Sequence, residues 1–191
     1  MSNKITNDVK DKSKVTKEEW KEFTKSVWSI ANTKHEVHPA MFPPEIPHRL
    51  VKLFSFYGEH VLDPFCGIGT AGSASLELNR KFIGIDTNKR YLTIANKNLK
   101  KVSSDNFSLI HGNSNNMDTI ENSTVGLIVT SPPYWNKADY GKVKGNIGSI
   151  DSYKKFLESI KPIFEECYRV LMSGRRLCIV TANVHQHTTN G

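Results

Sequence analysis

The residues best placed to do chemistry in this 191-residue chain are two aspartates, each of which ends an apolar run. Asp63 is followed by Gly67 and Gly69, and then by Thr70 at the predicted start of a helix. This order predicts a strand, a tight turn and a helix N-terminus. Glycines let the backbone approach a ligand closely, and a helix N-terminus presents free N–H groups to it. Asp86 lies 19 residues after Gly67, close to the spacing of about 20 expected for an acid that binds ribose.

The charge of Asp63 decides between two ligands for this turn. Residues 67–72 match G-x-G-x-x-G, the fingerprint of dinucleotide-binding proteins. A carboxylate at the strand end would oppose a pyrophosphate, whereas it favours a cationic ligand. S-adenosylmethionine carries a sulfonium and an ammonium group, so the turn predicts this cofactor. NAD remains the alternative ligand, and a turn or cap aspartate remains the alternative role of Asp63.

A second candidate site is Ser131-Pro132-Pro133-Tyr134, which follows directly on the apolar run 127–130. Two prolines fix the backbone and remove two N–H donors, so carbonyl oxygens are left exposed in a rigid geometry. This suits an exocyclic amine on a flat base, on which the tyrosine ring would stack. The Ser131 hydroxyl and a proline carbonyl would accept the two amine hydrogens and draw the nitrogen lone pair toward a methyl donor. The alternative is a rigid turn that leaves a strand.

Strands and helices alternate around these residues, which predicts a parallel sheet with both faces covered. Ligands of such sheets lie beyond the carboxyl ends of the strands, and the two aspartates, Asn113 and Ser131 all fall there. We therefore expect an α/β three-layer fold of the Rossmann-like type with at least five parallel strands. The expected strands cover 61–63, 82–86, 107–111, 125–130 and 177–184, and the expected helices cover 16–29, 44–57, 70–78, 88–101, 114–121 and 151–171.

The composition favours a polyanionic partner. Lysine and arginine total 26 against 19 aspartates and glutamates, a net charge of +7, which suits nucleic acid although the lysines are scattered. No apolar run reaches the roughly 18 residues that span a bilayer. Residues 1–14 lack the apolar segment of a signal peptide, so we predict a disordered tail and a cytoplasmic protein. Cys66, Cys167 and Cys178 indicate packed thiols in a reducing compartment.

Histidines near both ends of the chain raise the question of a metal site. His35 and His38 lie three residues apart, but no third ligand is evident and the prolines that follow break any helix that would present them. His185 and His187 stand in a polar terminal segment that we expect to be frayed. The sequence therefore predicts no metal.

With these motifs together, the chain resembles the amino-group DNA methyltransferases, which modify adenine N6 or cytosine N4. The resemblance covers most of residues 26–184. Residues 63–70 look like the family's cofactor loop, residues 84–86 look like its ribose-binding strand, and residues 131–134 are similar to its catalytic tetrapeptide. The combination of the three motifs is highly specific.

Two further segments resemble the same family. Residues 38–43 look like the segment that closes over the methionine end of the cofactor. Residues 168–175 resemble the helix-to-strand turn, in which a second glycine is usual and Arg175 stands instead. Asp86 and Ser131 are 45 residues apart, which leaves no room between them for a target-recognition domain. The order of the motifs resembles the class in which that domain comes last.

The resemblance implies S-adenosylmethionine as the cofactor and double-stranded DNA as the partner, with the target base leaving the stack to reach Tyr134. Lys137, Lys142 and Lys144 would contact phosphates, unless their loop is simply solvated. The implied catalytic residues are Ser131, Pro132, Pro133 and Tyr134, and the implied cofactor-binding residues are Phe42, Asp63, Pro64, Phe65, Cys66, Gly67, Gly69, Thr70, Asp86 and Asn113.

Residues 15–191 are expected to be an incomplete catalytic domain, because the family's sheet normally continues past the last predicted strand and only 185–191 remain. The C-terminal strands and the target-recognition domain would then be missing. A second chain or a missing C-terminal segment would supply target recognition. The apolar run 177–180 would form an exposed edge that invites pairing with another chain.

Ser131 favours cytosine N4 over adenine N6 as the target, because adenine enzymes of the family mostly carry Asp there, although Ser also occurs. The predicted function is a site-specific DNA methyltransferase of a restriction-modification system. An RNA base amino-methyltransferase, an NAD-dependent oxidoreductase and an inactive nucleic-acid-binding remnant remain as alternatives.

Overall fold

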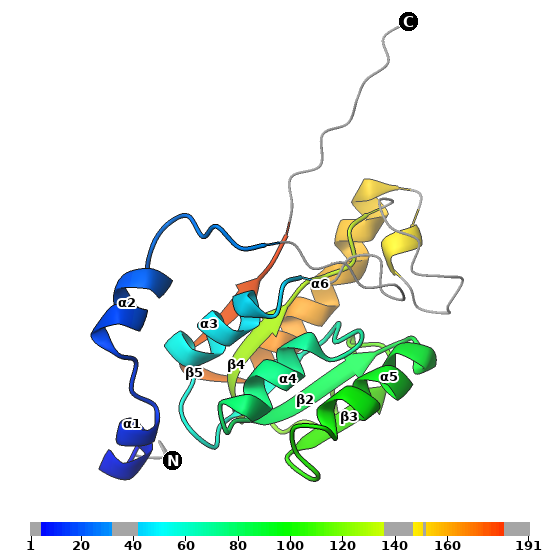
Figure 1. Ribbon diagram of the computed structural model, residues 1–191. Coiled ribbons are helices and arrows are strands. Elements are labelled where there is room, and N and C mark those ends of the chain that lie inside the picture. The colour runs from blue at the N-terminus through cyan, green and yellow to red at the C-terminus, as the bar shows by residue number, and fades with distance from the viewer. Residues whose placement is uncertain (1–4, 32–41, 136–146, 151, 182–191) are drawn as a thin grey trace, which may run out of the picture.

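The computed structural model describes residues 5–31, 42–135, 147–150 and 152–181, and Figure 1 shows how they are arranged. Both histidine pairs named above lie outside these residues, as do the three loop lysines and most of the segment 38–43.

One five-stranded sheet forms the centre of the molecule (Figure 1), and every pair of neighbouring strands in it is parallel. The strand order is β3-β2-β1-β4-β5. This confirms the predicted α/β fold with at least five parallel strands. The strands are β1 (His60–Asp63), β2 (Lys81–Asp86), β3 (Phe107–His111), β4 (Val125–Thr130) and β5 (Leu171–Ile179).

The direction in which strands are added reverses between β1 and β4. The chain first places β2 and β3 on one side of β1, and then returns to place β4 and β5 on the other side. Open α/β sheets bind ligands at such a switch point, beyond the carboxyl ends of the strands. Asp63 ends β1 and Thr130 ends β4. The predicted cofactor turn and the tetrapeptide therefore leave the sheet from adjacent strands at the switch point.

Helices cover both faces of the sheet, with α3, α4 and α5 on one face and α6 on the other (Figure 1). Successive strand residues point to opposite faces. Val61 accordingly packs in the core cluster on the α3–α5 face, and Leu62 packs in the cluster under α6. The helices are α1 (Asn7–Lys12), α2 (Lys17–Phe23), α3 (Glu45–Phe54), α4 (Thr70–Glu77), α5 (Lys89–Leu99) and α6 (Tyr153–Val170), with a short 3-10 helix η1 (Ile147–Ser149).

The predicted elements agree with the structure where the local signal is strong. β3 and β4 have the predicted bounds, and both ends of α4, α5 and α6 fall within two residues of the prediction. Thr16 and Glu19 form the predicted capping box at the start of α2. Continuous apolar runs and helix caps are local signals, so these elements need no information from distant parts of the chain.

Residues 114–121 were predicted as a short helix, and they form turns and irregular structure instead. The side-chain oxygens of Asn113 and Asn116 each accept a hydrogen bond from the amide two residues later. Such local bonds compete with the helical pattern. Arg169 of α6 donates a further hydrogen bond to the Met117 carbonyl, so tertiary contacts hold this loop in place.

The N-terminal region differs from the prediction in two ways. Residues 5–14, expected within a disordered tail, contain α1, and the hydroxyl of Ser13 accepts a hydrogen bond of 2.8 Å from the Tyr57 amide. α2 ends at Phe23 rather than near residue 29. The chain then leaves the helix, and the ring of Trp28 packs under the Arg49 guanidinium of α3 at 5.1 Å.

β5 begins directly after α6, at residue 171 rather than at 177. Its pairing with β4 is irregular around Gly174, which has a φ of 76°. Arg175 forms an ion pair with Glu59 and lies 4.9 Å from the centre of the Phe56 ring. Arg175 stands where a second glycine is usual in the family that the sequence resembles. Its contacts with Glu59 and Phe56 fix its side chain in this position. Residues 182–184 of the predicted strand lie outside the described residues.

Candidate active site

The turn between β1 and α4 has the tight backbone that its glycines predict. Gly67 (φ 50°) and Gly69 (φ 87°) lie in the left-handed region that favours glycine. The Gly69 amide donates a hydrogen bond of 2.8 Å to the Cys66 carbonyl and so closes the turn. Gly69 is the N-cap of α4 and provides no side-chain cap. The first amides of α4 are therefore placed to meet an acceptor on a ligand.

Residues that sequence reasoning missed hold this turn from neighbouring elements. Ser114, which is buried, donates its hydroxyl to the Pro64 carbonyl at 2.7 Å. Asn98 of α5 donates its side-chain amide to the Ile68 carbonyl at 3.1 Å. Each pair lies 30 or more residues apart in the chain, so no local pattern in the sequence could have revealed these contacts.

The third glycine of the G-x-G-x-x-G pattern serves packing. A Cβ at Gly72, inside α4, would lie only 2.6 Å from a ring carbon of Phe82 on β2. A Cβ at Gly84 of β2 would lie 2.9 Å from the sulfur of Cys66. The close approach of α4 and the turn to β2 therefore accounts for both glycines without any ligand contact.

Asp86, the predicted ribose acid, lies directly beside the turn at the end of β2. Its Oδ2 accepts a hydrogen bond of 2.8 Å from the Gly67 amide, and its Oδ1 accepts one of 2.8 Å from the Asn88 amide. Burial raises the pKa of the Asp86 carboxyl, and these two amide hydrogen bonds oppose the rise. A carboxylate oxygen can accept more than one hydrogen bond. The oriented carboxylate therefore retains capacity for two ribose hydroxyls.

Asp63, in contrast, is 1% exposed. Its Oδ1 accepts hydrogen bonds from the Phe65 amide at 3.0 Å and from the Thr130 hydroxyl at 2.7 Å. Burial raises the pKa of Asp63 to about 7, and the charge of Asp86 adds to the rise. These contacts support the alternative in which Asp63 holds the turn. Its predicted contact with the cofactor's cationic groups remains a prediction.

Asn113 and Phe42, the outlying members of the predicted cofactor set, lie on different parts of the chain. Gly112 donates its amide to the Asp86 carbonyl at 3.1 Å, so Asn113 follows a residue that is bonded to Asp86. The side chain of Asn113 accepts a hydrogen bond from the Asn115 amide. Phe42 packs against the core cluster on the α3–α5 face. Their roles toward a cofactor remain predictions.

The tetrapeptide begins where β4 ends, and each of its residues is partly exposed. The hydroxyls of Ser131 and Tyr134 lie 3.5 Å apart, so the two side chains predicted to meet a base lie side by side. Trp135 donates its indole N–H to the Ile150 carbonyl at 2.6 Å, and its ring lies 5.2 Å from that of Tyr153 on α6. The residue after the tetrapeptide is therefore anchored to the start of α6.

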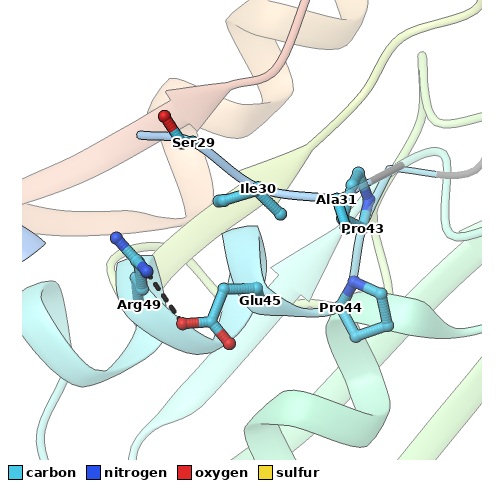
Figure 2. Close-up of a pocket in the computed structure, with 7 residues that line it drawn as sticks. All are labelled: Ser29, Ile30, Ala31, Pro43, Pro44, Glu45 and Arg49. Carbon is cyan, nitrogen blue, oxygen red and sulfur yellow. Dashed lines mark hydrogen bonds and ion pairs between the residues drawn. The ribbon is translucent and has the colours of Figure 1, made fainter. Parts of the chain in front are cut away.

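An open pocket of about 350 Å³ lies at the N-terminal end of α3 (Figure 2). Its charged groups pair with each other, because Arg49 Nε donates to Glu45 Oε1 at 2.8 Å (Figure 2). The Arg49 guanidinium also lies over the rings of Phe23 and Trp28. We assign no ligand to this pocket. Its lining residues are Ser29, Ile30, Ala31, Pro43, Pro44, Glu45 and Arg49.

Comparison with known proteins identifies the family. A family model described as DNA methylase matches residues 1–97 and 125–188, which is most of the chain. The chain belongs to this DNA methylase family. The predicted resemblance is confirmed at this level. A second model, described as RNA cap guanine-N2 methyltransferase, matches residues 58–151.

The similar proteins include curated relatives of greater length. The chain is 40% identical over 92 residues to the type II methyltransferase M.BglI of Bacillus subtilis, and the match covers 47% of this chain and 26% of that protein. It is 43% identical over 83 residues to the type II methyltransferase M.MjaI of Methanocaldococcus jannaschii, covering 40% of this chain and 27% of that protein. The chain thus matches about a quarter of the length of each relative.

Solved structures support the fold. A TehB-like SAM-dependent methyltransferase from Corynebacterium glutamicum superposes with a TM-score of 0.51 at 16% identity, over 70% of this chain and 60% of that one. In the described part of the chain, no helix is long and apolar enough to cross a membrane. The same residues contain no group of three or more histidines, cysteines, aspartates or glutamates that could hold a metal ion.

Proposed function

We propose that this chain transfers a methyl group from S-adenosylmethionine to an exocyclic amine of a base in double-stranded DNA. One observation carries the proposal. The glycine turn, with Asp86 beside it, and the tetrapeptide leave the sheet from adjacent strands at the switch point, where the Asp63–Thr130 hydrogen bond of 2.7 Å joins them. Membership of a DNA methylase family supports the same reaction.

The turn and Asp86 form the cofactor half of the proposed site. When bound, S-adenosylmethionine supplies an activated methyl group on its sulfonium. The Asp86 carboxylate would accept the ribose hydroxyls, since the Gly67 and Asn88 amides already orient it. The amides at the start of α4 would meet acceptor atoms of the ligand. The other residues assigned to this half are Phe42, Asp63, Pro64, Phe65, Cys66, Gly69, Thr70 and Asn113.

The tetrapeptide would hold the target base. The ring of Tyr134 would stack on the base, while the Ser131 hydroxyl and a proline carbonyl would accept the two amine hydrogens. We propose cytosine N4 as the preferred target, because a neutral hydroxyl suffices if the amine attacks directly and its proton leaves for solvent afterwards. The base has to leave the helical stack to reach this position.

The names of the relatives support a role in a restriction-modification system. Both curated relatives described above are type II methyltransferases, and we propose a restriction-modification role in the cytoplasm for this protein. The match covers only part of each relative. We propose that a further segment or a second chain contributes target recognition.

Cofactor binding is the first experiment. Titration calorimetry of the 191-residue chain should show binding of S-adenosylmethionine and none of NAD. Asp86→Ala should weaken binding by roughly ten- to a hundredfold, since it removes hydrogen bonds to a charged group. Asp105→Ala, at an exposed loop position, is the matched control. An unchanged affinity in folded Asp86→Ala would remove the assignment of the ribose acid.

Product analysis is the second experiment. The chain is incubated with labelled S-adenosylmethionine and either DNA or RNA of mixed sequence, and the methylated nucleosides are separated by mass spectrometry. We expect N4-methylcytosine in DNA. N6-methyladenine as the sole product would refute the proposed base. Label found only in RNA would favour an RNA amino-methyltransferase, the second candidate, to which the match with the RNA cap guanine-N2 methyltransferase model points.

A further inference from the structure

A single oxygen atom contacts both halves of the proposed site. Asp63 Oδ1 accepts a hydrogen bond of 3.0 Å from the Phe65 amide, at the start of the cofactor turn. The same oxygen accepts one of 2.7 Å from the Thr130 hydroxyl, at the end of β4. Asp63 is 1% exposed and Thr130 is fully buried. Water therefore does not replace either bond when it breaks, which makes breaking costly.

This contact lies where the backbone pairing of the two strands has ended. The last paired residues of β1 and β4 are Leu62 and Ile128. Beyond them, the side chains of Asp63 and Thr130 continue the connection. The Thr130 carbonyl also accepts a hydrogen bond of 2.8 Å from the Val180 amide on the other side of β4. Both the backbone and the side chain of Thr130 are therefore fixed.

The position of Thr130 determines where the tetrapeptide begins. Ser131 follows it directly, and the next two residues are prolines, which restrict the backbone and donate no backbone hydrogen bond. A shift at Thr130 is consequently passed along a stiff segment toward Tyr134. Movement of the Phe65 amide on ligand binding would reach the same carboxylate oxygen.

We propose that the Asp63–Thr130 hydrogen bond positions the catalytic tetrapeptide and couples it to the occupancy of the cofactor turn. The coupling rests on the proposed function, whereas the positioning does not require it. Asp63 and Thr130 act here as positioning residues, through Ser131 and the prolines rather than by touching the base.

Amide hydrogen exchange of the whole chain tests the positioning without an activity assay. Thr130→Val removes the hydroxyl and keeps the side-chain volume, and Thr130→Ser keeps the hydroxyl as the matched control. We expect Thr130→Val to raise the exchange rates of the Ser131 and Tyr134 amides by about tenfold, while the amides inside β4 exchange as in the wild type. Thr130→Ser should behave as the wild type.

S-adenosylhomocysteine is the probe for the coupling. It should slow exchange of the Ser131 and Tyr134 amides in the wild type and in Thr130→Ser, and have no such effect in Thr130→Val. Its calorimetric affinity for Thr130→Val should change by less than about threefold, which a generally unfolded variant would not show. Without ligand, Asp63→Asn retains an acceptor oxygen for the Thr130 hydroxyl and should keep the wild-type exchange rates of the Ser131 and Tyr134 amides.

Equal exchange of the Ser131 and Tyr134 amides in Thr130→Val and the wild type would overturn the proposal, as would an increase spread evenly over β4. If the wild type binds no S-adenosylhomocysteine, the proposed function and the coupling both fail. The comparison of Thr130→Val with the wild type in the absence of ligand still tests whether the hydrogen bond positions the tetrapeptide. If Thr130→Val does not fold, the exchange rate of the Thr130 hydroxyl proton is measured by NMR in the wild type instead. Slow exchange of that proton supports the bond, and rapid exchange overturns it.

Discussion

The buried carboxyl of Asp63 should make the stability of this protein fall as the pH rises. Burial raises the pKa of Asp63 from 3.8 to about 7, the charge of Asp86 adds to the rise, and the two hydrogen bonds that Asp63 accepts oppose it. Cys66 and Cys167 also lie near this charge, and their own pKa values are raised. They therefore stay protonated over the pH range in which Asp63 titrates.

The sign follows from proton binding. The unfolded chain releases the Asp63 proton near pH 3.8, and the folded chain holds it until about pH 7. Between these values the folded state binds more protons, so the free energy of unfolding decreases as the pH rises. This contribution is complete below about pH 4 and lost above about pH 7. At about 1.4 kcal/mol for each pKa unit, it amounts to about 4 kcal/mol.

Asp63→Asn tests this linkage, because the amide oxygen can accept both hydrogen bonds and has no proton to lose. Urea unfolding of the variant and the wild type is followed by circular dichroism from about pH 4 to about pH 8. The variant should gain up to about 4 kcal/mol relative to the wild type across this range. Comparison at each pH cancels the titration of most other groups. A constant difference, or one with the opposite slope, would refute the reasoning.

Two further substitutions test contacts that hold the sheet and its helices together. Arg175→Ala removes a partly buried ion pair with Glu59 and should lower the free energy of unfolding by about 1–3 kcal/mol in urea titrations. No loss of stability would contradict that assignment. Gly72→Ala forces a methyl group against Phe82 and should cost about 1–3 kcal/mol, whereas Gly112→Ala, with open space around it, should cost little. Equal effects of the two glycine variants would show that α4 moves freely away from β2.

The sequence was sufficient to predict which segments of the candidate site lie close together, because this depends on the topology of the sheet. Once the strands are parallel, their carboxyl ends lie at one edge, so motifs that follow separate strands converge without any knowledge of contacts. The bounds of β4 could be predicted because all six of its residues are buried, which produces an unbroken apolar run. The arrangement of Asp86 beside the glycine turn follows the expected spacing.

Contacts between residues far apart in the chain could not be predicted from local sequence patterns. Asp63 and Thr130 are 67 residues apart, so the burial of the aspartate could not be read from its own neighbourhood. Residues 114–121 were predicted as a short polar helix and form turns and irregular structure instead. These turns depend on Asn113 and Asn116 and on Arg169, 52 residues after Met117.

Burial of Cys66 decides how the glycine turn responds to oxidants and alkylating reagents. The side chain is 5% exposed, its sulfur fills the space above Gly84, and burial raises the pKa of its thiol well above 9.0. Oxidants and alkylating reagents react with the thiolate rather than the thiol. We therefore expect the folded turn to resist peroxide and iodoacetamide although it carries a cysteine. The rate at which Cys66 becomes alkylated then reports how often the turn opens.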